Sequence, residues 1–423
     1  MLGPMRPKSL SVWLKWLKPA ARFATKSSLG LGLALAQVLC QKAAAQENVY
    51  LTDVPDYDWY AGCFGTATGN LMGFWDRHGM SDFYTGPTAG GVAPLNSYET
   101  ANRGIYSLWV SKAGRDGRPY DKLGHEDDYY VAYESVAPDP YVTAGRAEHP
   151  ADCIGDFIGL NQNKWTGLGG ECDGNIDGFS YNFFDATGNR RVNYTPPMSG
   201  GKVVTDIQSG IRAWSKYRGY DADVYSQLSE LNPETPAGKG FTWDDLRREI
   251  KAGYPVLVFL QSPYEKSRYI GSMKKANPEI HGMLIFGYYD DGAGNRSARI
   301  RNSWGSSTWD AFRPWRFETW TPSIGNVFLP TRGFITFHPR PKLKTFTRAA
   351  GAFNLTWEGP SSEVMDESLG TTTLPHKYVV ERATTLNPPN FEIVAGPTTT
   401  KQASIPMAAV PGAYFRLRIV DPQ

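Results

Sequence analysis

The chain has 423 residues, and 41% of them are hydrophobic, which is enough for a sizeable core and favours two domains over one. Lys and Arg together number 44, against 42 for Asp and Glu. This near balance gives no overall field that would attract a nucleic acid or an anionic membrane, so neither is expected as a partner. Aromatic residues make up 13% of the chain, which fits a core of short strands, with a sugar-stacking surface as the alternative.

The first 45 residues have the pattern of an export signal. Six cations and no acid precede an apolar run from Leu29 to Leu39, and three alanines ending at Ala45 predict cleavage before Gln46. The apolar run is about half of the roughly 20 residues that a membrane span needs, so an anchor is the weaker alternative. Acylation of Cys40 is another alternative, although Leu39 occupies a position where lipoprotein signals usually require a small residue. We expect a secreted or periplasmic protein without a membrane contact after cleavage.

Removal of the signal leaves an odd number of cysteines, namely Cys63, Cys153 and Cys172. Cys153 and Cys172 are near neighbours in a stretch rich in Gly and Asp, where a disulfide would staple a short loop in an oxidising compartment. Cys63 would then keep its thiol. Pairing of Cys63 elsewhere, or an inert place in the core, remains the alternative.

A run of alternating oxygen-bearing residues follows Cys172. Asp173, Asn175 and Asp177 have the spacing of ligands in a calcium loop. Phe184 stands where the closing bidentate acid would be, and a tight turn rich in Asp, Asn and Gly explains the same string. Calcium is therefore a weak candidate cofactor, and no other metal pattern emerges.

Helical periodicity is clear in three places. Apolar residues at helical spacing predict one helix after Trp59, a second that opens at Thr205 and a third that opens at Thr242. Cys63 stands at or just before the N-terminus of the first of these. Residues from about 80 to 200 are rich in Gly, Asp, Tyr and Pro with weak periodicity, which indicates long loops and short strands.

The period changes to that of strands in the second half of the chain. Two prolines and several cations between His338 and Lys344 indicate a hinge, and an all-β stretch follows it. Before the hinge the predicted strands are Val256–Leu260, Gly282–Tyr289 and Ala298–Asn302. After it, alternation predicts strands around Phe353–Trp357, Tyr378–Val380 and Phe415–Ile419, which suit a small β-sandwich.

Three residues form a candidate nucleophilic site. A thiol with its ordinary pKa of about 8.5 is mostly protonated at neutral pH, and catalysis needs the thiolate. The helix N-terminus at Cys63 offers positive potential, and His281, at the head of an apolar strand, can take up the proton. Asn302, which shares a face with the apolar residues of the next strand, can orient the imidazole through its side-chain carbonyl.

These segments resemble papain-like cysteine peptidases. The motifs are His281-Gly-Met-Leu-Ile-Phe-Gly-Tyr and, after a polar turn, Ile300-Arg-Asn-Ser-Trp-Gly305, in the family order Cys, His, Asn. Trp59-Tyr-Ala-Gly-Cys63-Phe-Gly-Thr-Ala is similar to the branch related to bacteriocin-leader peptidases. The resemblance implies that Trp304 shields the histidine–asparagine hydrogen bond from water. It also places Tyr57 where the family usually has the glutamine of the oxyanion hole, so that Tyr57 either replaces that donor or marks a loss of activity.

The resemblance covers residues 54–79 and about 241–337, and it implies an α+β papain-like fold. We therefore expect a signal peptide at 1–45, a peptidase domain at 46–338 with an insertion at about 80–200, and a fibronectin type III-like sandwich at 345–423. The predicted function is hydrolysis of peptide bonds in a peptide or protein substrate through a thioester acyl-enzyme, without a cofactor. The alternative is an impaired homologue that acts as an exported binding or adhesion protein, and the C-terminal domain is the candidate for holding a surface or glycan.

Overall fold

The computed structural model describes residues 45–60, 62–85, 91–110, 153–158, 198–199, 202–203, 207–233, 235, 237–261, 280–305, 313–316, 330–387, 389–407 and 413–420. The expected export signal therefore lies outside the described residues. Within them, no helix is long and apolar enough to cross a membrane.

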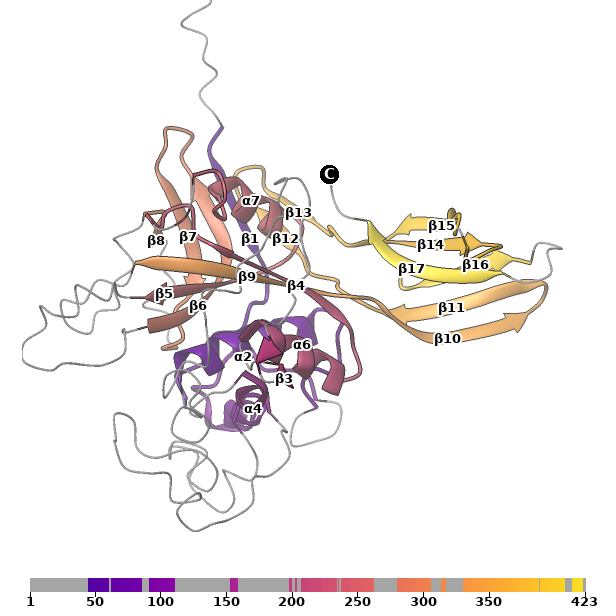
Figure 1. Ribbon diagram of the computed structural model, residues 1–423, viewed down its shortest axis with the longest axis horizontal. Helices are drawn as coiled ribbons and strands as arrows, with labels where there is room; N and C mark the ends of the chain where they lie inside the picture. Colours follow the sequence, from indigo (N-terminus) through magenta and orange to yellow (C-terminus); the bar gives the residue numbers. More distant parts are fainter. Residues whose placement is uncertain are drawn as a thin grey trace, which may run out of the picture. The chain divides into compact units, whose positions relative to one another are not determined.

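Helices and antiparallel sheets make up the described part of the chain, which confirms the prediction of an α+β protein. The helices are α2 (Cys63–Arg77), the 3-10 helix η1 (Thr100–Leu108), α4 (Ile154–Ile158), α6 (Ile207–Tyr217) and α7 (Trp243–Lys251). The three predicted helices correspond to α2, α6 and α7. Figure 1 shows α2, α4 and α6 grouped together, away from α7.

The largest sheet has the strand order β13-β12-β1-β6-β5-β9-β4, and β6 also pairs with β7, which pairs with β8. The predicted strands at Val256, Gly282 and Ala298 are β5, β6 and β7. The strands of this largest sheet are β1 (Glu47–Leu51), β4 (Ala222–Leu228), β5 (Val256–Gln261), β6 (Ile280–Asp290), β7 (Arg296–Arg301), β8 (Arg313–Pro314), β9 (Thr331–Pro339), β12 (Val364–Asp366) and β13 (Thr371–Thr373). A separate short pair joins β2 (Met198–Ser199) to β3 (Lys202–Val203).

Two smaller three-stranded sheets follow β9, with the orders β10-β11-β16 and β15-β14-β17. Their strands are β10 (Lys342–Ala349), β11 (Ala352–Glu358), β14 (Lys377–Ala383), β15 (Glu392–Thr398), β16 (Gln402–Pro406) and β17 (Tyr414–Val420). A hydrophobic cluster of their own, built around Leu355, Trp357 and Tyr378, lies apart from the main core. The alternation seen in the sequence thus places apolar side chains between two small sheets.

Between β11 and β14 in the sequence, the chain returns to the large sheet, where it forms β12 and β13. β12 pairs with β1 in antiparallel register, with Leu51 opposite Val364 and Val49 opposite Asp366. Residues 364–373, which fall inside the range expected for the sandwich, therefore extend the sheet that carries the catalytic candidates. Residues 45–423 accordingly form one compact unit.

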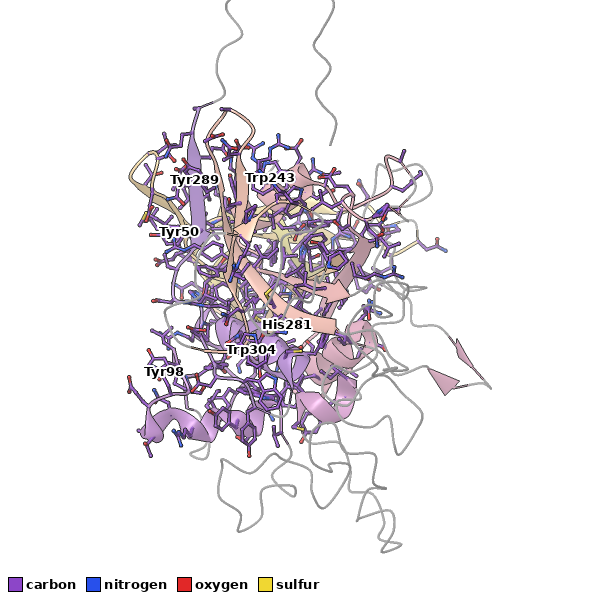
Figure 2. All side chains as sticks on the ribbon, turned by 90° about the vertical axis from the view of Figure 1, so that its left-hand side faces the viewer. Tyr50, Tyr98, Trp243, His281, Tyr289 and Trp304 are labelled. Carbon is purple, nitrogen blue, oxygen red and sulfur yellow. The ribbon has the colours of Figure 1, made fainter. Side chains whose placement is uncertain are left out.

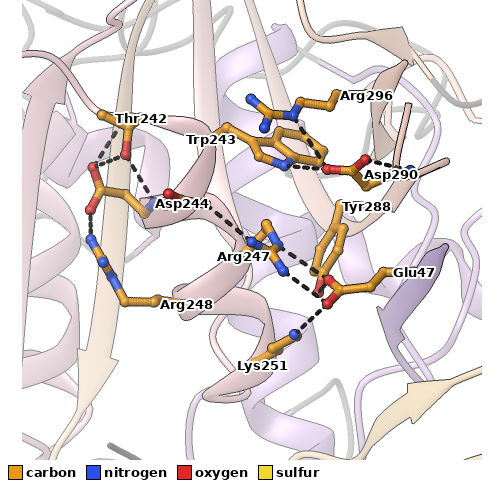
Figure 3. Close-up of polar contacts among 12 residues, drawn as sticks. Glu47, Thr242, Trp243, Asp244, Arg247, Arg248, Lys251, Tyr288, Asp290 and Arg296 are labelled. Carbon is orange, nitrogen blue, oxygen red and sulfur yellow. Dashed lines mark hydrogen bonds and ion pairs between the residues drawn. The ribbon is translucent and has the colours of Figure 1, made fainter. Parts of the chain in front are cut away.

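The N-terminal strand β1 is fixed to α7 by a network around Glu47, shown in Figure 3. The Glu47 carboxylate accepts hydrogen bonds from the Tyr288 hydroxyl at 2.6 Å, from Arg247 Nη2 at 2.8 Å and from Lys251 Nζ at 3.1 Å. Burial acts to raise the pKa of Glu47, but these hydrogen bonds outweigh it and lower the pKa. The negative charge of Glu47 is therefore held between β1, β6 and α7.

We expect Glu47→Gln to lower the free energy of unfolding by about 1 to 2 kcal/mol, because the amide keeps the shape of the side chain but loses its charge-assisted hydrogen bonds. Urea unfolding at pH 7 measures the change. Asp244→Asn is the matched control, because Asp244 binds the same Arg247 but is 67% exposed, so its loss is expected to cost less than about 0.5 kcal/mol. Equal losses in the two variants would contradict the prediction.

Candidate active site

Cys63 is the first residue of α2, as the helical pattern predicted. Its side chain is 3% exposed, and no side chain caps the helix at Gly62. The first intrahelical bond runs from the Thr66 N–H to the Gly62 carbonyl. The N–H groups of the first turn and the positive end of the helix dipole therefore lie at the end of α2 that carries Cys63. There they favour a negative charge on its sulfur.

The segment that precedes Cys63 is fastened to the side of α2. The Tyr57 N–H donates to Asn70 Oδ1 at 2.9 Å, and the Tyr60 N–H donates to Thr66 Oγ1 at 3.3 Å. Both acceptors lie on α2 and are fully buried. These two hydrogen bonds therefore tie the segment to the first half of α2.

Tyr57 does not lie where an oxyanion donor would be needed. Its side chain is fully buried, its hydroxyl donates to the Pro94 carbonyl at 2.8 Å, and its ring stacks on Trp109. The hydroxyl contacts α2 at Gly73, where a Cβ would collide with it. Ten residues of helix separate Gly73 from Cys63, roughly 15 Å. Of the two alternatives for Tyr57, the buried position of its side chain favours the loss of a side-chain donor over a replacement of it.

His281 lies on β6 and is 4% exposed. Its Nε2 atom is 2.8 Å from the main-chain carbonyl oxygen of Asn302. A carbonyl oxygen can only accept a hydrogen bond, so Nε2 carries the proton in the neutral ring. Nδ1 is then the basic nitrogen, the atom that can take a proton from a thiol.

Asn302 orients the histidine through a different atom from the one expected. β7 ends at Arg301, so Asn302 is the first residue after the strand, and its side-chain oxygen accepts a hydrogen bond from the Trp304 N–H at 2.9 Å. The main-chain carbonyl of Asn302 is the partner of His281. The prediction of a side-chain carbonyl is therefore corrected: the side chain shapes the turn, and the backbone of that turn holds the imidazole.

The turn from Asn302 to Gly305 has an unusual backbone. Ser303 has a φ of 65°, a left-handed conformation that is uncommon outside glycine, and its buried hydroxyl donates to the Gly282 carbonyl at 2.8 Å. Gly305 has a φ of 66°, and a Cβ there would collide with Asp58. The Asp58 carboxyl at this contact has a raised pKa, because its burial outweighs the nearby charge of Arg103, which acts to lower the pKa. The turn therefore rests on the segment that leads to Cys63.

Trp304, in this turn, lies next to His281 (Figure 2). Its ring stacks on the imidazole of His281 with a centroid separation of 5.5 Å and an angle of 14° between planes. On the segment before Cys63, Trp59 stacks on Trp304 at 6.3 Å. Trp304 is 39% exposed, so it lies between the imidazole and solvent.

α2, which begins at Cys63, and β6, which carries His281, are in direct contact. A Cβ on Gly282 would lie 2.9 Å from the ring of Phe64, and Phe64 stacks on Phe259 of β5 at 5.0 Å. Phe64 follows Cys63 in the chain, and Gly282 follows His281. The start of α2 at residues 63–64 therefore lies beside β6 at residues 281–282, and Asn302 contacts His281 directly.

The remaining predicted sites lie elsewhere. Cys153, just before α4, is buried, and Cys172, its expected disulfide partner, lies outside the described residues. Asp173, Asn175 and Asp177, the weak calcium candidates, also lie outside them. In the part of the chain that is described, no group of three or more His, Cys, Asp or Glu side chains is arranged to hold a metal ion.

Comparison of the chain with protein-family models, with curated proteins and with solved structures finds no match.

Proposed function

We propose that the chain is an exported cysteine peptidase of papain-like architecture. The observation that carries this proposal is the hydrogen bond between His281 Nε2 and the Asn302 carbonyl, because it leaves Nδ1 basic on a histidine whose strand packs against the nucleophile helix. Cys63 at the N-terminus of α2 supplies the thiol. Export is supported by the charge and apolar pattern of the first 45 residues.

In the proposed reaction, His281 Nδ1 takes the proton of Cys63, and the thiolate sulfur attacks the carbonyl carbon of a peptide bond. The carbonyl oxygen becomes an oxyanion, which the N–H groups at the start of α2 stabilise. The C–N bond then breaks, and the departing amine takes the proton from the imidazolium. Water, deprotonated by His281, next attacks the thioester carbon and releases the carboxylic acid and the thiol.

A second candidate function follows from the position of Tyr57. With its hydroxyl bonded to the Pro94 carbonyl, this residue is not available as the side-chain donor that the family usually places there. Loss of one oxyanion donor typically lowers the rate by roughly 100- to 1,000-fold. An impaired homologue that binds a polysaccharide or a surface protein is therefore the alternative to an active peptidase.

Alkylation of Cys63 by iodoacetamide at pH 6 distinguishes the two candidates. An ordinary thiol is less than about 1% thiolate at this pH, so activation by His281 raises the labelling rate by on the order of 100-fold. We expect fast labelling of Cys63, located by mass spectrometry, and slow labelling in His281→Ala. Equally slow labelling of Cys63 in both proteins would reject the peptidase.

A further inference from the structure

Arg301, the last residue of β7, connects the histidine side of the site to the nucleophile side. Its Nη2 atom donates to the Val54 carbonyl at 2.8 Å, and its Nη1 atom is 3.7 Å from the Asp56 carboxylate. Both ionic side chains are shielded, with exposures of 16% and 11%. A planar guanidinium can bind a carbonyl and a carboxylate at once, which an ammonium cannot do with the same geometry.

The guanidinium is itself fixed in place. Its carbon lies 4.7 Å from the centroid of the Phe286 ring on β6, within the range of a cation–π interaction. In the sheet, Arg301 is directly opposite Leu284. The position of the guanidinium is therefore set by β6 and β7, the two strands that also carry His281 and lead into Asn302.

The segment that Arg301 binds also contacts α2, the helix that begins at Cys63. The Asp56 N–H donates to the Leu95 carbonyl at 2.8 Å, and the next residue, Tyr57, is bonded through its N–H to Asn70 of α2. A shift of Val54 and Asp56 relative to β7 would therefore be transmitted to α2 and to Cys63 at its first turn. Misplacement of a reacting group by about 1 Å can lower a rate by on the order of 100-fold.

We propose that Arg301 is a positioning residue that sets the separation of Cys63 from His281 by binding Val54 and Asp56 to β7. This inference rests on the proposed function, because the separation matters only if the two side chains react together. Arg301 touches no reacting atom in this scheme. It acts through the backbone on both sides of the site.

The test compares Arg301→Gln and Arg301→Lys with Arg299→Gln. Arg299 is the matched control, since it lies on the same strand and the same face and its guanidinium is 5.5 Å from the same Phe286 ring, but its nearer ring is Tyr50 on β1. We expect Arg301→Gln to lower the pH 6 alkylation rate of Cys63 by about tenfold. Arg301→Lys should recover part of the rate, and Arg299→Gln should stay within about twofold of the unchanged protein.

Hydrogen exchange of residues 54–60 is the second measurement, and it does not depend on thiol reactivity. Arg301→Gln is expected to raise exchange of the Asp56 and Tyr57 amides by about tenfold, because these lose their anchor, whereas Arg299→Gln leaves them unchanged. Slow labelling of the unchanged protein with this exchange pattern would reject the peptidase but keep the anchor. Equal effects of the Arg301 and Arg299 variants on both measurements would overturn the positioning role.

Discussion

Replacing His281 by glutamine is expected to lower kcat/KM for peptide hydrolysis by about 100- to 10,000-fold, whereas Asn302→Ala should lower it by less than about tenfold. Glutamine has no basic nitrogen, so it cannot take the proton of Cys63. The alanine variant keeps the main-chain carbonyl that accepts from His281 Nε2. It loses only the side-chain contact with the Trp304 N–H.

Hydrolysis of a mixture of fluorogenic peptides measures both effects, with Cys63→Ala as the blank. Trp304→Ala gives an independent control, because it removes the ring that stacks on His281 without touching a hydrogen bond of the imidazole. If Asn302→Ala abolished activity as fully as His281→Gln while its melting temperature stayed unchanged, the amide side chain and not the backbone would be the group that orients the histidine.

Local sequence patterns were sufficient to predict most of the elements that carry the site. The apolar spacing after Trp59 predicted α2, and the position of Cys63 at its N-terminus followed from it. Thr242 forms a capping box with Asp245, so the start of α7 was encoded within four residues. The alternation around Ala298 and Ile300 predicted β7, whose burial pattern places both side chains in the core.

The details that the sequence did not reveal depend on contacts between distant segments. The pairing of β12 with β1 joins residues more than 300 positions apart, and no local pattern encodes such a partner. The direction of Tyr57 was decided by a carbonyl at Pro94, in a loop without periodicity. Asn302 could be placed next to His281, but whether its backbone or its side chain faces the imidazole depends on the left-handed conformation of Ser303.

In the sequence, Arg301 is one of two cations that alternate with the apolar residues of β7. Such a residue is usually a solvated strand position, and the alternation of Arg299 and Arg301 gave no reason to separate the two. The two differ because the Arg299 guanidinium lies over the Tyr50 ring of β1, whereas the Arg301 guanidinium donates to the Val54 carbonyl. Trp59 is a similar case, because its partner Trp304 comes from the far end of the domain.

Two histidines outside the candidate active site are buried where the C-terminal residues meet the large sheet. His338 lies on β9, 2.5 Å from the Glu249 carboxylate, and its ring stacks on Tyr254. His376 is 3% exposed, and its Nε2 atom is 2.8 Å from Ser362 Oγ. These contacts of His338 and His376 therefore join β9 and α7 to the residues on either side of β12 and β13.

The protonation state of His376 is defined by its neighbours. The Ser362 hydroxyl donates to the Gly253 carbonyl, so its oxygen accepts from His376 Nε2–H, and Nδ1 is the unprotonated nitrogen. Nδ1 is buried without a hydrogen-bond partner among the described residues. Burial, reinforced by His338 and more weakly by His78 and Lys401, lowers the pKa of His376 to about 3.

Acidification is therefore expected to destabilise the fold through His376. In the unfolded chain this residue binds a proton below its ordinary pKa of 6.5, but in the folded chain it does so only near a pKa of about 3. The unfolded state consequently binds more protons between these values, so the free energy of unfolding falls as the pH falls from 6.5 toward 3. Over the whole interval the loss is on the order of 4 kcal/mol, and about 2 kcal/mol of it falls between pH 6.5 and 5.

The variant His376→Gln isolates this contribution, because glutamine can donate to Ser362 but does not titrate. Urea unfolding at pH 6.5 and pH 5 gives the change in the free energy of unfolding for each protein. Subtracting the change in the variant from the change in the unchanged protein cancels the contributions of the titrating groups that the two share. One such group is Asp76, whose pKa burial raises to about 7, so its protonation acts in the opposite direction in both proteins. We expect the unchanged protein to lose about 2 kcal/mol more than the variant over this interval. Equal losses would show that His376 titrates normally and that the contact of the C-terminal residues with β9 and α7 does not depend on its neutrality.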